Sequence, residues 1–456
     1  MQRLPSPAGG APPSRPLSPA SPVGRGLPYR TAPPAAGRGH GLHELFEAQV
    51  EARPGAVAVD FGGLRTTYVE LDRRANRIAR RLRARGVGRG MLVGIQVPRS
   101  VDAYAALLGI LKAGAAYVPI DPECPTDRVR HVLSDCGAAA FVTTSALAQN
   151  LRDMVIRLDG DHEAIEAESP ERLPGHEVGV SPRDACYVIY TSGPTGRPQG
   201  VVVEHRSASH VARTEGCIFG VRSEDRVYQG FPLAIDDSVE EIWLAFHAGA
   251  TLVPATPEMA HAGPELSRRL ADAGVTVLAC APALLSTLVD DAPTVRLLLV
   301  GGGACSESLV ARWAKPGRRM VNTYGPTEAT VIATCANLRP GVPVTIGRPI
   351  PGCRVHLLDH DLRPVPPGKT GEICIGGVGV ARGYAGLPEQ TRERFVPDPF
   401  AQSDEFGARL YRTGDLGRLD AEGNIVFLGR AESQVQRGSG AAPTNGTGRT
   451  SGTTWR

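Results

Sequence analysis

The sequence has almost no lysine. Only Lys112, Lys315 and Lys369 are lysines among 456 residues, and every other basic side chain is arginine or histidine. Basic and acidic side chains nearly balance, with a formal net charge of +3 at pH 7. A surface that binds nucleic acid needs an excess of clustered positive charge. We therefore expect no nucleic-acid partner, and few positions can serve a reaction step that depends on lysine.

Cysteine pairs and long apolar runs are also missing. The nine cysteines are widely spaced, and no two of them form a C-x-x-C pair. This spacing argues against a disulfide framework and against a zinc site. No run of about 18 apolar residues occurs, which is the length that a membrane-spanning helix requires. The sequence therefore predicts no membrane contact, a reducing compartment and a cytoplasmic location.

Both ends of the chain lack what a folded core needs. Residues 1–40 are rich in Pro, Gly, Ala and Arg, and no acidic residue precedes Glu44. Such a segment cannot bury enough apolar surface, so we expect a disordered leader. An organelle transit peptide is the alternative, although the prolines disfavour the amphipathic helix of such peptides. After Val435 no Leu, Ile, Val, Phe or Met occurs, and this predicts a disordered tail.

Between these ends, short apolar strands alternate with amphipathic helices. Apolar residues recur at helical spacing from Thr67, and residues 91–97 have the continuous apolar pattern of a buried strand. This alternation predicts an α/β fold with mainly parallel sheets and flanking helices. After about Pro340 the chain changes to short strands with Gly and Pro turns, which predicts a small β-barrel over about residues 340–428.

The first chemical signal is the stretch Tyr187-Val-Ile-Tyr-Thr-Ser-Gly-Pro-Thr-Gly-Arg-Pro-Gln-Gly-Val201. An apolar strand runs into a loop of hydroxyls and glycines, and a helix is expected to follow from Ser207. Glycines let the backbone approach a phosphate, while N–H groups and hydroxyls donate hydrogen bonds to it. The loop is not the G-x-x-x-x-G-K-[ST] loop of common nucleoside triphosphatases. An ordinary surface turn is the more frequent explanation of such a loop on its own.

The order of these residues resembles the Thr-Ser-Gly-Ser-Thr-Gly-x-Pro-Lys-Gly signature of the adenylate-forming superfamily, which includes acyl-CoA synthetases, luciferases and the adenylation domains of nonribosomal peptide synthetases. Two positions differ, because Pro194 replaces a Ser and Gln199 replaces the Lys that is thought to hold the pyrophosphate end of ATP. Loss of that charge-assisted donor predicts weaker transition-state stabilisation. The resemblance implies one catalytic residue, Thr191, and phosphate binding by Thr191, Ser192, Gly193, Thr195 and Gly196.

Asn322-Thr-Tyr-Gly-Pro-Thr-Glu328 resembles the second strong signature of this family. The resemblance implies that Tyr324 stacks on adenine and that Asn322 reads the adenine amino edge. It also implies that Thr327 reaches the α-phosphate and that Glu328 is catalytic through a bound Mg²⁺. Mg²⁺ prefers hard oxygen ligands and commonly combines one protein carboxylate with phosphate oxygens.

Further blocks follow in the family's order. A glycine-rich turn after a buried strand is expected to pack on the other adenine face through Gly302, Gly303 and Ala304. Asp415 is placed by the resemblance to accept both ribose hydroxyls, and Arg430 lies near the same sugar. Residues 111–122 resemble a segment typical of amino-acid-activating members. In that segment we expect Lys112 to be a solvated helix-end residue rather than a catalytic one.

Ile235-Asp-Asp-Ser-Val-Glu-Glu-Ile-Trp243 resembles the Phe-Asp-x-Ser stretch whose first Asp, here Asp236, pairs with the substrate α-ammonium. Three acids lie among the family's specificity positions, and they favour a second ammonium, as in lysine, ornithine or diaminobutyrate. The alternative is that Asp237 or Glu240 faces solvent or pairs with an arginine. Carried across one at a time, these substrate-binding positions are Asp236, Asp237, Glu240, Ala279, Leu299, Gly301, Thr323, Val331 and Ile332.

The resemblance covers the chain from Leu42 to about Val435. It implies an AMP-binding adenylation core of two mainly parallel sheets over residues 41–430, followed by a hinge remnant and an aberrant tail over residues 431–456. The C-terminal lid of the family is expected to be absent, and no lysine follows Lys369 to supply the lid lysine.

The implied reaction joins an amino acid and MgATP into aminoacyl-AMP and pyrophosphate. A phosphopantetheinyl carrier is the expected acceptor of the activated group. The missing lid and Gln199 predict that the chain alone is weak or inactive. An acyl- or aryl-CoA ligase core and a catalytically silent nucleotide-binding fragment are the two alternatives.

Overall fold

A computed structural model describes residues 41–148, 154–192, 198–401 and 408–431. These residues belong to one compact unit, Ala32–Arg456. The leader predicted over residues 1–40 and the tail predicted beyond residue 431 lie outside the described residues. No helix in the described ranges is both long and apolar enough to cross a membrane.

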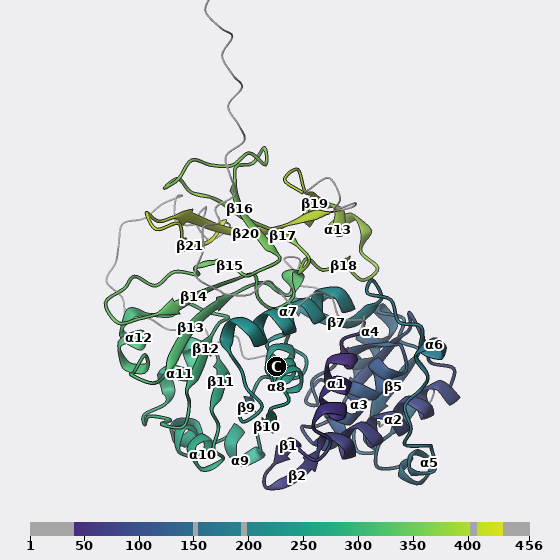
Figure 1. Cartoon of the computed structure of the whole chain (residues 1–456). Coiled ribbons are helices and arrows are strands. Elements are labelled where there is room, and N and C mark those ends of the chain that lie inside the picture. The colour runs from purple at the N-terminus through teal and green to yellow at the C-terminus, as the bar shows by residue number, and fades with distance from the viewer. Residues whose placement is uncertain (1–40, 149–153, 193–197, 402–407, 432–456) are drawn as a thin grey trace, which may run out of the picture. The chain divides into compact units, whose positions relative to one another are not determined.

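The largest sheet has nine strands, and its six central strands, from β13 to β1, pair in parallel (Figure 1). Antiparallel strands lie at both of its edges. Parallel sheets are covered on both faces, which explains continuously apolar runs such as Leu297–Val300. In spatial order the strands are β15 (Arg348–Pro349), β14 (Thr334–Leu338), β13 (Arg319–Tyr324), β12 (Leu297–Val300), β11 (Val277–Cys280), β9 (Arg226–Gln229), β10 (Thr251–Pro254), β1 (Val57–Phe61) and β2 (Leu64–Thr67).

Different helices cover the two faces of this sheet. On one face, alternate side chains such as Leu298 and Met320 form a core with apolar residues of the short helices that connect the strands. On the other face, α8 packs against β9 and β10, and α7 packs against α8. The helices of this region are α7 (His205–Phe219), α8 (Asp237–Ala248), α9 (Pro257–Ala260), η1 (Gly263–Glu265), α10 (Leu266–Asp272), α11 (Pro282–Thr287), α12 (Glu307–Trp313) and η2 (Thr327–Ala329).

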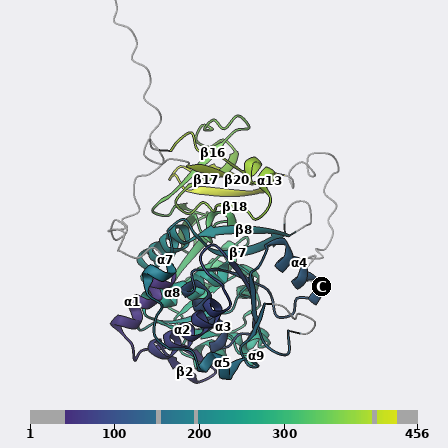
Figure 2. The same cartoon turned by 90° about the vertical axis from the view of Figure 1, so that its right-hand side faces the viewer.

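The second sheet has seven strands, which pair in parallel from β7 to β6 and antiparallel at the β8 and β18 edge. In spatial order they are β18 (Gly383–Tyr384), β8 (Pro198–Glu204), β7 (Ala185–Ser192), β4 (Ala116–Pro119), β3 (Leu92–Gln96), β5 (Ala140–Thr143) and β6 (Val155–Arg157). Its helices are α1 (His43–Ala52), α2 (Tyr68–Ala84), α3 (Val101–Lys112), α4 (Thr126–Asp135), α5 (His162–Glu166) and α6 (Gly175–Val178). Because α7 also contacts β7 and β8, the α7–α8 pair lies between the two sheets (Figures 1 and 2).

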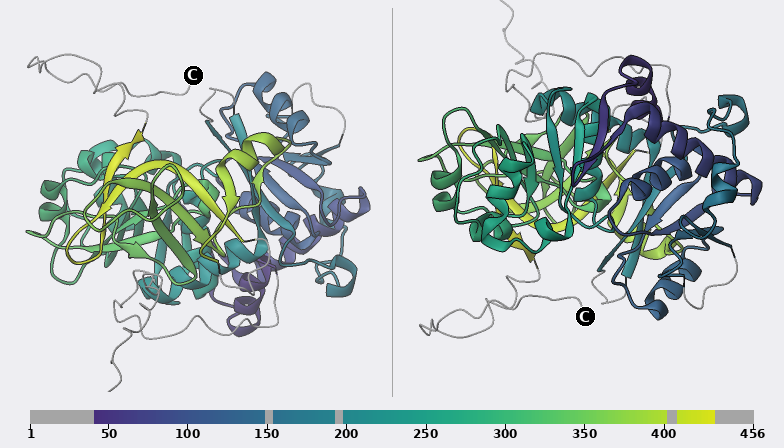
Figure 3. Two further views of the ribbon diagram at one scale, coloured as in Figure 1. Left: turned by 90° about the horizontal axis from the view of Figure 1, so that it is seen from above. Right: turned by 90° about the horizontal axis from the view of Figure 1, so that it is seen from below.

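The third sheet is small and antiparallel, and Figure 3 shows its green and yellow strands in front in the view from above. Its elements are β16 (Cys353–Leu358), β17 (Gly371–Gly377), α13 (Pro388–Arg394), β19 (Phe395–Pro397), β20 (Arg409–Leu419) and β21 (Ile425–Arg430). The short antiparallel strands agree with the texture predicted after Pro340. Strands β19 and β21 pair with successive stretches of β20, so the described pairings do not close the ring that a barrel requires.

The α/β fold with parallel sheets that the sequence predicts is confirmed, whereas two local predictions are wrong. The helix expected from Ser207 begins at His205, but β8 comes between it and the loop and pairs antiparallel with β7. The β-branched run Val201 to Val203 favours this strand. Lys112 is only 4% exposed rather than solvated, because Asp72 (Oδ1 at 2.8 Å) and another carboxylate form ion pairs with it.

Candidate functional site

Most of the sequence-predicted positions gather where parallel strands of the large sheet end. Strands β11, β12 and β13 run side by side and end at Cys280, Val300 and Tyr324. Ligands of open α/β sheets bind beyond the carboxyl ends of such strands. The predicted nucleotide and substrate residues over 301–304 and 322–332 follow or end these strands. The fold therefore places both sets at one edge of the sheet.

The predicted phosphate loop joins β7 to β8. Thr191 is half-buried and Ser192 is exposed at the end of β7, while Gly193, Thr195 and Gly196 lie outside the described residues. Gln199 pairs with Thr191 across the hairpin and is 6% exposed. The residue that replaces the family's lysine is therefore a buried strand residue at the base of this loop.

Tyr324, Asp415 and Arg430, predicted from three separate blocks, meet in one polar cluster. The Tyr324 hydroxyl donates to Asp415 Oδ2 (2.7 Å), and Arg430 Nε lies 3.0 Å from Asp415 Oδ1. Burial raises the pKa of the Asp415 carboxyl, although Tyr324 and Arg430 oppose that shift. Thr413 supports the cluster by accepting from the Asp415 backbone N–H (2.9 Å). Asp415 and Arg430 face each other on the paired strands β20 and β21.

Asn322 lies on β13, two residues before Tyr324, and is 5% exposed. Its Nδ2 donates to the backbone oxygen of Thr345 (2.8 Å). That bond fixes the plane of the amide and leaves Oδ1 as the acceptor group of this side chain. The alternation of β13 places Asn322 and Tyr324 on the same face of the strand.

Thr327 and Glu328 form a short 3₁₀ turn after β13. The Tyr384 hydroxyl donates to Glu328 Oε1 (2.8 Å) and holds the half-buried carboxylate in place. Sequence reasoning treated the block that contains Tyr384 as structural and missed this contact. No group of three or more His, Cys, Asp or Glu in the described ranges is arranged to hold a metal ion. A divalent ion at Glu328 therefore needs oxygens from a ligand.

The chain just after this turn adopts an unusual backbone conformation. Thr330 and Val331 have φ angles of 58° and 67°. Positive φ is a strained conformation for β-branched residues and is often found at functional sites. A Cβ on Gly325 would lie 2.5 Å from the Val331 carbonyl oxygen, so glycine is required where this turn folds back. The Thr330 hydroxyl donates to the Gly379 backbone oxygen (2.6 Å) and stabilises the turn.

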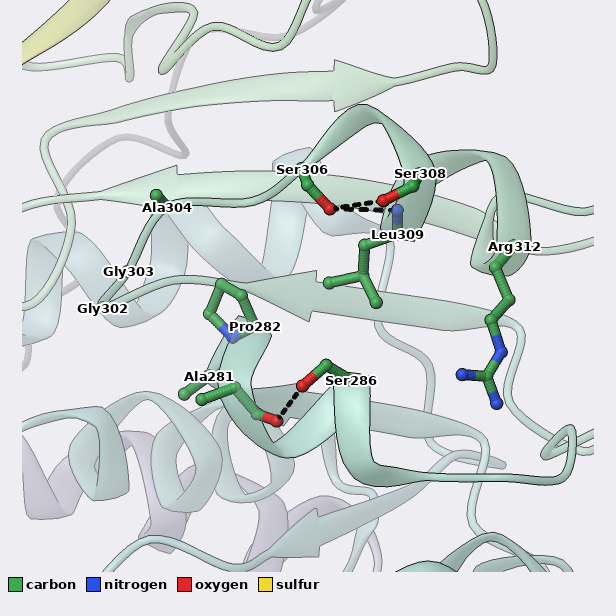
Figure 4. Close-up of a pocket in the computed structure, with 11 residues that line it drawn as sticks. Ala281, Pro282, Ser286, Gly302, Gly303, Ala304, Ser306, Ser308, Leu309 and Arg312 are labelled. Carbon is green, nitrogen blue, oxygen red and sulfur yellow. Dashed lines mark hydrogen bonds between the residues drawn. The ribbon is translucent and has the colours of Figure 1, made fainter. Parts of the chain in front are cut away.

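Gly302, Gly303 and Ala304 line a cavity of about 520 Å³ between α11 and α12 (Figure 4). Small side chains and hydroxyls form the rest of its wall, and Arg312 lies at one side. Ser306 caps α12, because its Oγ accepts from the Leu309 N–H (3.2 Å). Tyr324 and Asn322 do not line this cavity. The structure therefore brings the glycine-rich turn to the same edge as the Tyr324 cluster but does not join them in one cavity.

The apolar substrate positions share the face of the large sheet that α7 and α8 cover. Ala279 pairs with Leu299 in register, and Leu299 and Gly301 point to the same side of their strand. Neither Ala279 nor Leu299 belongs to the core on the opposite face, which is built from their sequence neighbours. Thr323 approaches Gly301 so closely that a Cβ there would lie 2.6 Å from Thr323 Oγ1. Val331 and Ile332 are also buried, at 6% and 2% exposure.

Four carboxyl groups lie together at this face, and we call Asp236, Asp237, Glu240 and Glu215 the acidic group. The first three stand at the start of α8, where the helix dipole favours negative charge. Burial and then Asp237 raise the pKa of Asp236 to about 7, against a hydrogen bond from the Thr327 side chain. Burial, Asp237 and Asp236 raise the pKa of Glu240 to about 8.

Glu215 on α7 was missed in the sequence. Burial and the charge of Glu240 raise its pKa well above the usual range. A signal was present, because Glu215 follows Val211 by one helical turn on the apolar face of an amphipathic helix. An acid at such a position requires a partner.

Comparisons with known proteins agree with this arrangement. Residues 46–385 match the family model of the AMP-binding enzymes. The chain is 45% identical over 400 residues to a linear gramicidin synthase of Brevibacillus parabrevis, covering 87% of this chain and 5% of that protein. It is 37% identical over 395 residues to delta-poly-L-ornithine synthetase of Acinetobacter baumannii (strain AB307-0294), covering 87% of this chain and 29% of that protein.

Solved structures give the same result. The nonribosomal peptide synthetase FmoA3 in an AMPPNP-bound form aligns with a TM-score of 0.78 at 37% identity, over 87% of this chain and 43% of that one. Its α-methyl-L-serine-AMP-bound form also aligns with a TM-score of 0.78 at 37% identity, over 86% and 45%. The chain spans less than half of the length of each of these relatives. Because the family model matches most of its residues, the chain belongs to the family of AMP-binding enzymes.

Proposed function

We propose that this chain activates an amino acid by adenylation. A substrate carboxylate oxygen attacks the α-phosphorus of ATP, the bond from that phosphorus to the bridging oxygen breaks, and pyrophosphate leaves. The observation that carries the proposal is the position of Asp236, whose pKa responds to Thr327 and Glu328. A buried carboxylate suited to an α-ammonium thus lies beside the residues expected to meet the α-phosphate and its metal ion. An acyl- or aryl-CoA ligase has no need for such a carboxylate.

The nucleotide roles follow from the geometry around Tyr324. Asn322 Oδ1 accepts the adenine amino group while the Tyr324 ring stacks on the base. Asp415 accepts the two ribose hydroxyls, and Arg430 lies beside the same sugar. The backbone of the turn over Gly302, Gly303 and Ala304 approaches the other face of adenine.

The phosphates meet the loop after β7 and the turn after β13. Thr191, Ser192, Gly193, Thr195 and Gly196 donate to phosphate oxygens, and Thr327 reaches the α-phosphate. Glu328 supplies one hard oxygen ligand to Mg²⁺, with the remainder from phosphates and water. This fits a half-buried carboxylate that Tyr384 orients. The ion, when bound, offsets the negative charge that develops on the pyrophosphate.

Residues on the α7–α8 face define the amino-acid substrate. Asp236 pairs with the α-ammonium, and the side chain of the substrate extends among Asp237, Glu240, Ala279, Leu299, Gly301, Thr323, Val331 and Ile332. Three acids in this set favour a diamino acid, and the similarity to an ornithine-named synthetase is in keeping with this choice. The acceptor of the activated group is the thiol of a phosphopantetheinyl carrier, the general acceptor in nonribosomal peptide synthetases.

Thermal unfolding and isotope exchange test the proposal. A ligand of the native state stabilises it by RT ln(1 + [L]/Kd), so MgATP should raise the melting temperature. MgGTP serves as a control for unspecific phosphate binding. Exchange of labelled pyrophosphate into ATP, measured with a panel of amino acids, reports the reaction itself. A melting temperature that MgATP leaves unchanged contradicts the proposal.

A further inference from the structure

Two buried glutamates on neighbouring helices have unmet hydrogen-bonding capacity. Glu215 on α7 is 1% exposed, and Glu240 on α8 is 4% exposed. In each, Oε1 is buried and has no hydrogen-bond partner among the described residues. Glu241, the next residue on α8, behaves differently, because its carboxylate accepts from the Gln229 side chain (2.9 Å) and from two backbone N–H groups. Unmet capacity is therefore not a general property of buried acids here.

An independent polar group faces the same place. The Tyr187 hydroxyl on β7 is fully buried and also lacks a hydrogen-bond partner within the ranges that the structure describes. Burial raises its pKa most, and the nearby charges include those of Asp236 and Glu215. Because α7 packs against both β7 and α8, unpaired polar atoms from three elements surround one site between the sheets.

Nothing on the protein side neutralises the two glutamates. Burial and other carboxylates raise the pKa of each, and no arginine, lysine or histidine of the described chain acts against that shift. An unpaired buried carboxylate is costly, and buried charges are retained where they are paired. Paired carboxylates with an adjacent hydroxyl provide the acceptors that an ammonium group, with its three N–H donors, requires.

The spacing along α8 suggests the length of the ligand. Asp236 and Glu240 are four residues apart at the start of the helix, which corresponds to about 6 Å of axial rise on one helix face. This is close to the separation of the two nitrogens in an extended 2,5-diamino acid. A neutral substrate of the same length would leave the second pair of acids without a partner.

We propose that Glu215 and Glu240 bind the side-chain ammonium of a diamino acid whose α-ammonium pairs with Asp236. The inference rests on the proposed function and narrows its substrate to amino acids with a second cationic group, ornithine being the length that fits. Glu215 then determines specificity although it is outside the nine positions that family resemblance supplies. A competing explanation is that the two glutamates share one proton as a purely structural pair.

Isothermal titration of the full chain with two amino acids of equal length tests this. With a non-hydrolysable MgATP analogue present, L-ornithine should bind at least about 30-fold more tightly than L-norvaline, which lacks only the second amine. Glu215→Gln and Glu240→Gln should each weaken ornithine binding by about 10–100-fold and change norvaline binding by less than about threefold. Equal affinity of the two ligands for the unmodified chain overturns the proposal, as does an unchanged ornithine-to-norvaline ratio in Glu215→Gln.

Two controls separate a binding role from a structural one. Glu241→Gln removes an equally buried but fully bonded carboxylate of α8, and it should leave the ornithine-to-norvaline ratio unchanged. Ligand-free Glu215→Gln should unfold at a urea concentration no lower than the unmodified chain, whereas a proton-sharing pair predicts a clear drop. If Glu215→Gln does not fold, the wild-type ratio and Glu240→Gln decide. If the analogue binds and ornithine has no advantage, only this inference fails; if neither analogue nor amino acid binds, the proposed function fails too.

Discussion

The nucleotide half and the amino-acid half of the site differ in how far their polar groups are satisfied without a ligand. On the nucleotide side, Tyr324 donates to Asp415, and Tyr384 donates to Glu328. On the amino-acid side, the acidic group includes two carboxylates with buried oxygens that accept no hydrogen bond within the described chain. The first half is internally bonded, and the second is prepared for a partner that it does not contain.

This difference teaches how each ligand gains affinity. A nucleotide must exchange existing bonds, such as the one between Tyr324 and Asp415, for new ones of similar strength, so its net gain is modest. A cationic amino acid meets groups that already carry the cost of burial, so its pairing yields a larger net gain. Substitutions in the two halves should therefore differ in size and in their effect on the ligand-free protein.

The largest effect is expected at Asp236. Asp236→Asn keeps the shape but removes the charge that meets the α-ammonium, and amino-acid affinity should fall by about 100-fold or more. Titration calorimetry with MgATP analogue present measures this loss. Affinity for the analogue itself should change by less than about threefold, because Asp236 belongs to the other half of the site. A parallel loss of nucleotide affinity would break the comparison.

The next effect is expected at Asp415. Asp415→Ala removes the acceptor of the ribose hydroxyls, and MgATP affinity should fall by about 10–100-fold. The ligand-free protein should also melt earlier, since Tyr324 and Arg430 lose their shared partner. Tyr324→Phe, which keeps the aromatic ring, is the matched control and should weaken MgATP less. Equal losses in the two variants would place the affinity in the hydroxyl rather than in the carboxylate.

A pH series sharpens the comparison without any ligand. The pKa of Asp236 is raised to about 7 and that of Glu240 to about 8, against about 4 in an unfolded chain. The native state then holds more protons than the unfolded state in this interval, so the free energy of unfolding should fall as pH rises from about 5 to about 8.

Urea midpoints across this range measure that decline, and Glu240→Gln should flatten it by removing one titrating group. The other acids that face these two, Asp237, Glu215 and Glu328, titrate in both proteins and cancel in the difference. A slope that is identical in the variant would mean that Glu240 is ionised in the free protein at low pH.

The smallest effect is expected at Gln199. Gln199→Lys restores the residue of the family signature, but position 199 is 6% exposed and paired with Thr191 in a hairpin. We expect pyrophosphate exchange to rise by less than about tenfold. Gln199→Met, which has similar length and no charge, is the control. A gain of several hundredfold would mean that this single cation limits the reaction.

Local periodicity was sufficient for the parts of the fold with strong patterns. The helix that begins after Thr67 was predicted from apolar spacing, and the capping box between Thr67 and Glu70 explains why it starts there. The strand β8 was missed because Pro198 and Gly200 resemble loop residues, whereas pairing with β7 determines the outcome. Lys112 was misjudged because its partners come from other helices, which no local pattern reveals.

The candidate site shows the same limit. Family resemblance was enough to identify Asp236, Ala279 and Leu299, which the structure places on the α7–α8 face. Their binding roles stay predictions until ligands are tested. Glu215 and Tyr384 could not be found in this way, because their importance depends on neighbours from distant parts of the chain.

The close approach between Gly301 and Thr323 has a consequence for altering the substrate range of this chain. A side chain at Gly301 would collide with Thr323 Oγ1 and, at 3.2 Å, with the backbone oxygen of the same residue. Replacement of Thr323 by a smaller residue removes only the first of these obstacles. Directed evolution of a new specificity should therefore proceed through Ala279 and Leu299, while Gly301 accepts change only after a shift of the neighbouring strand.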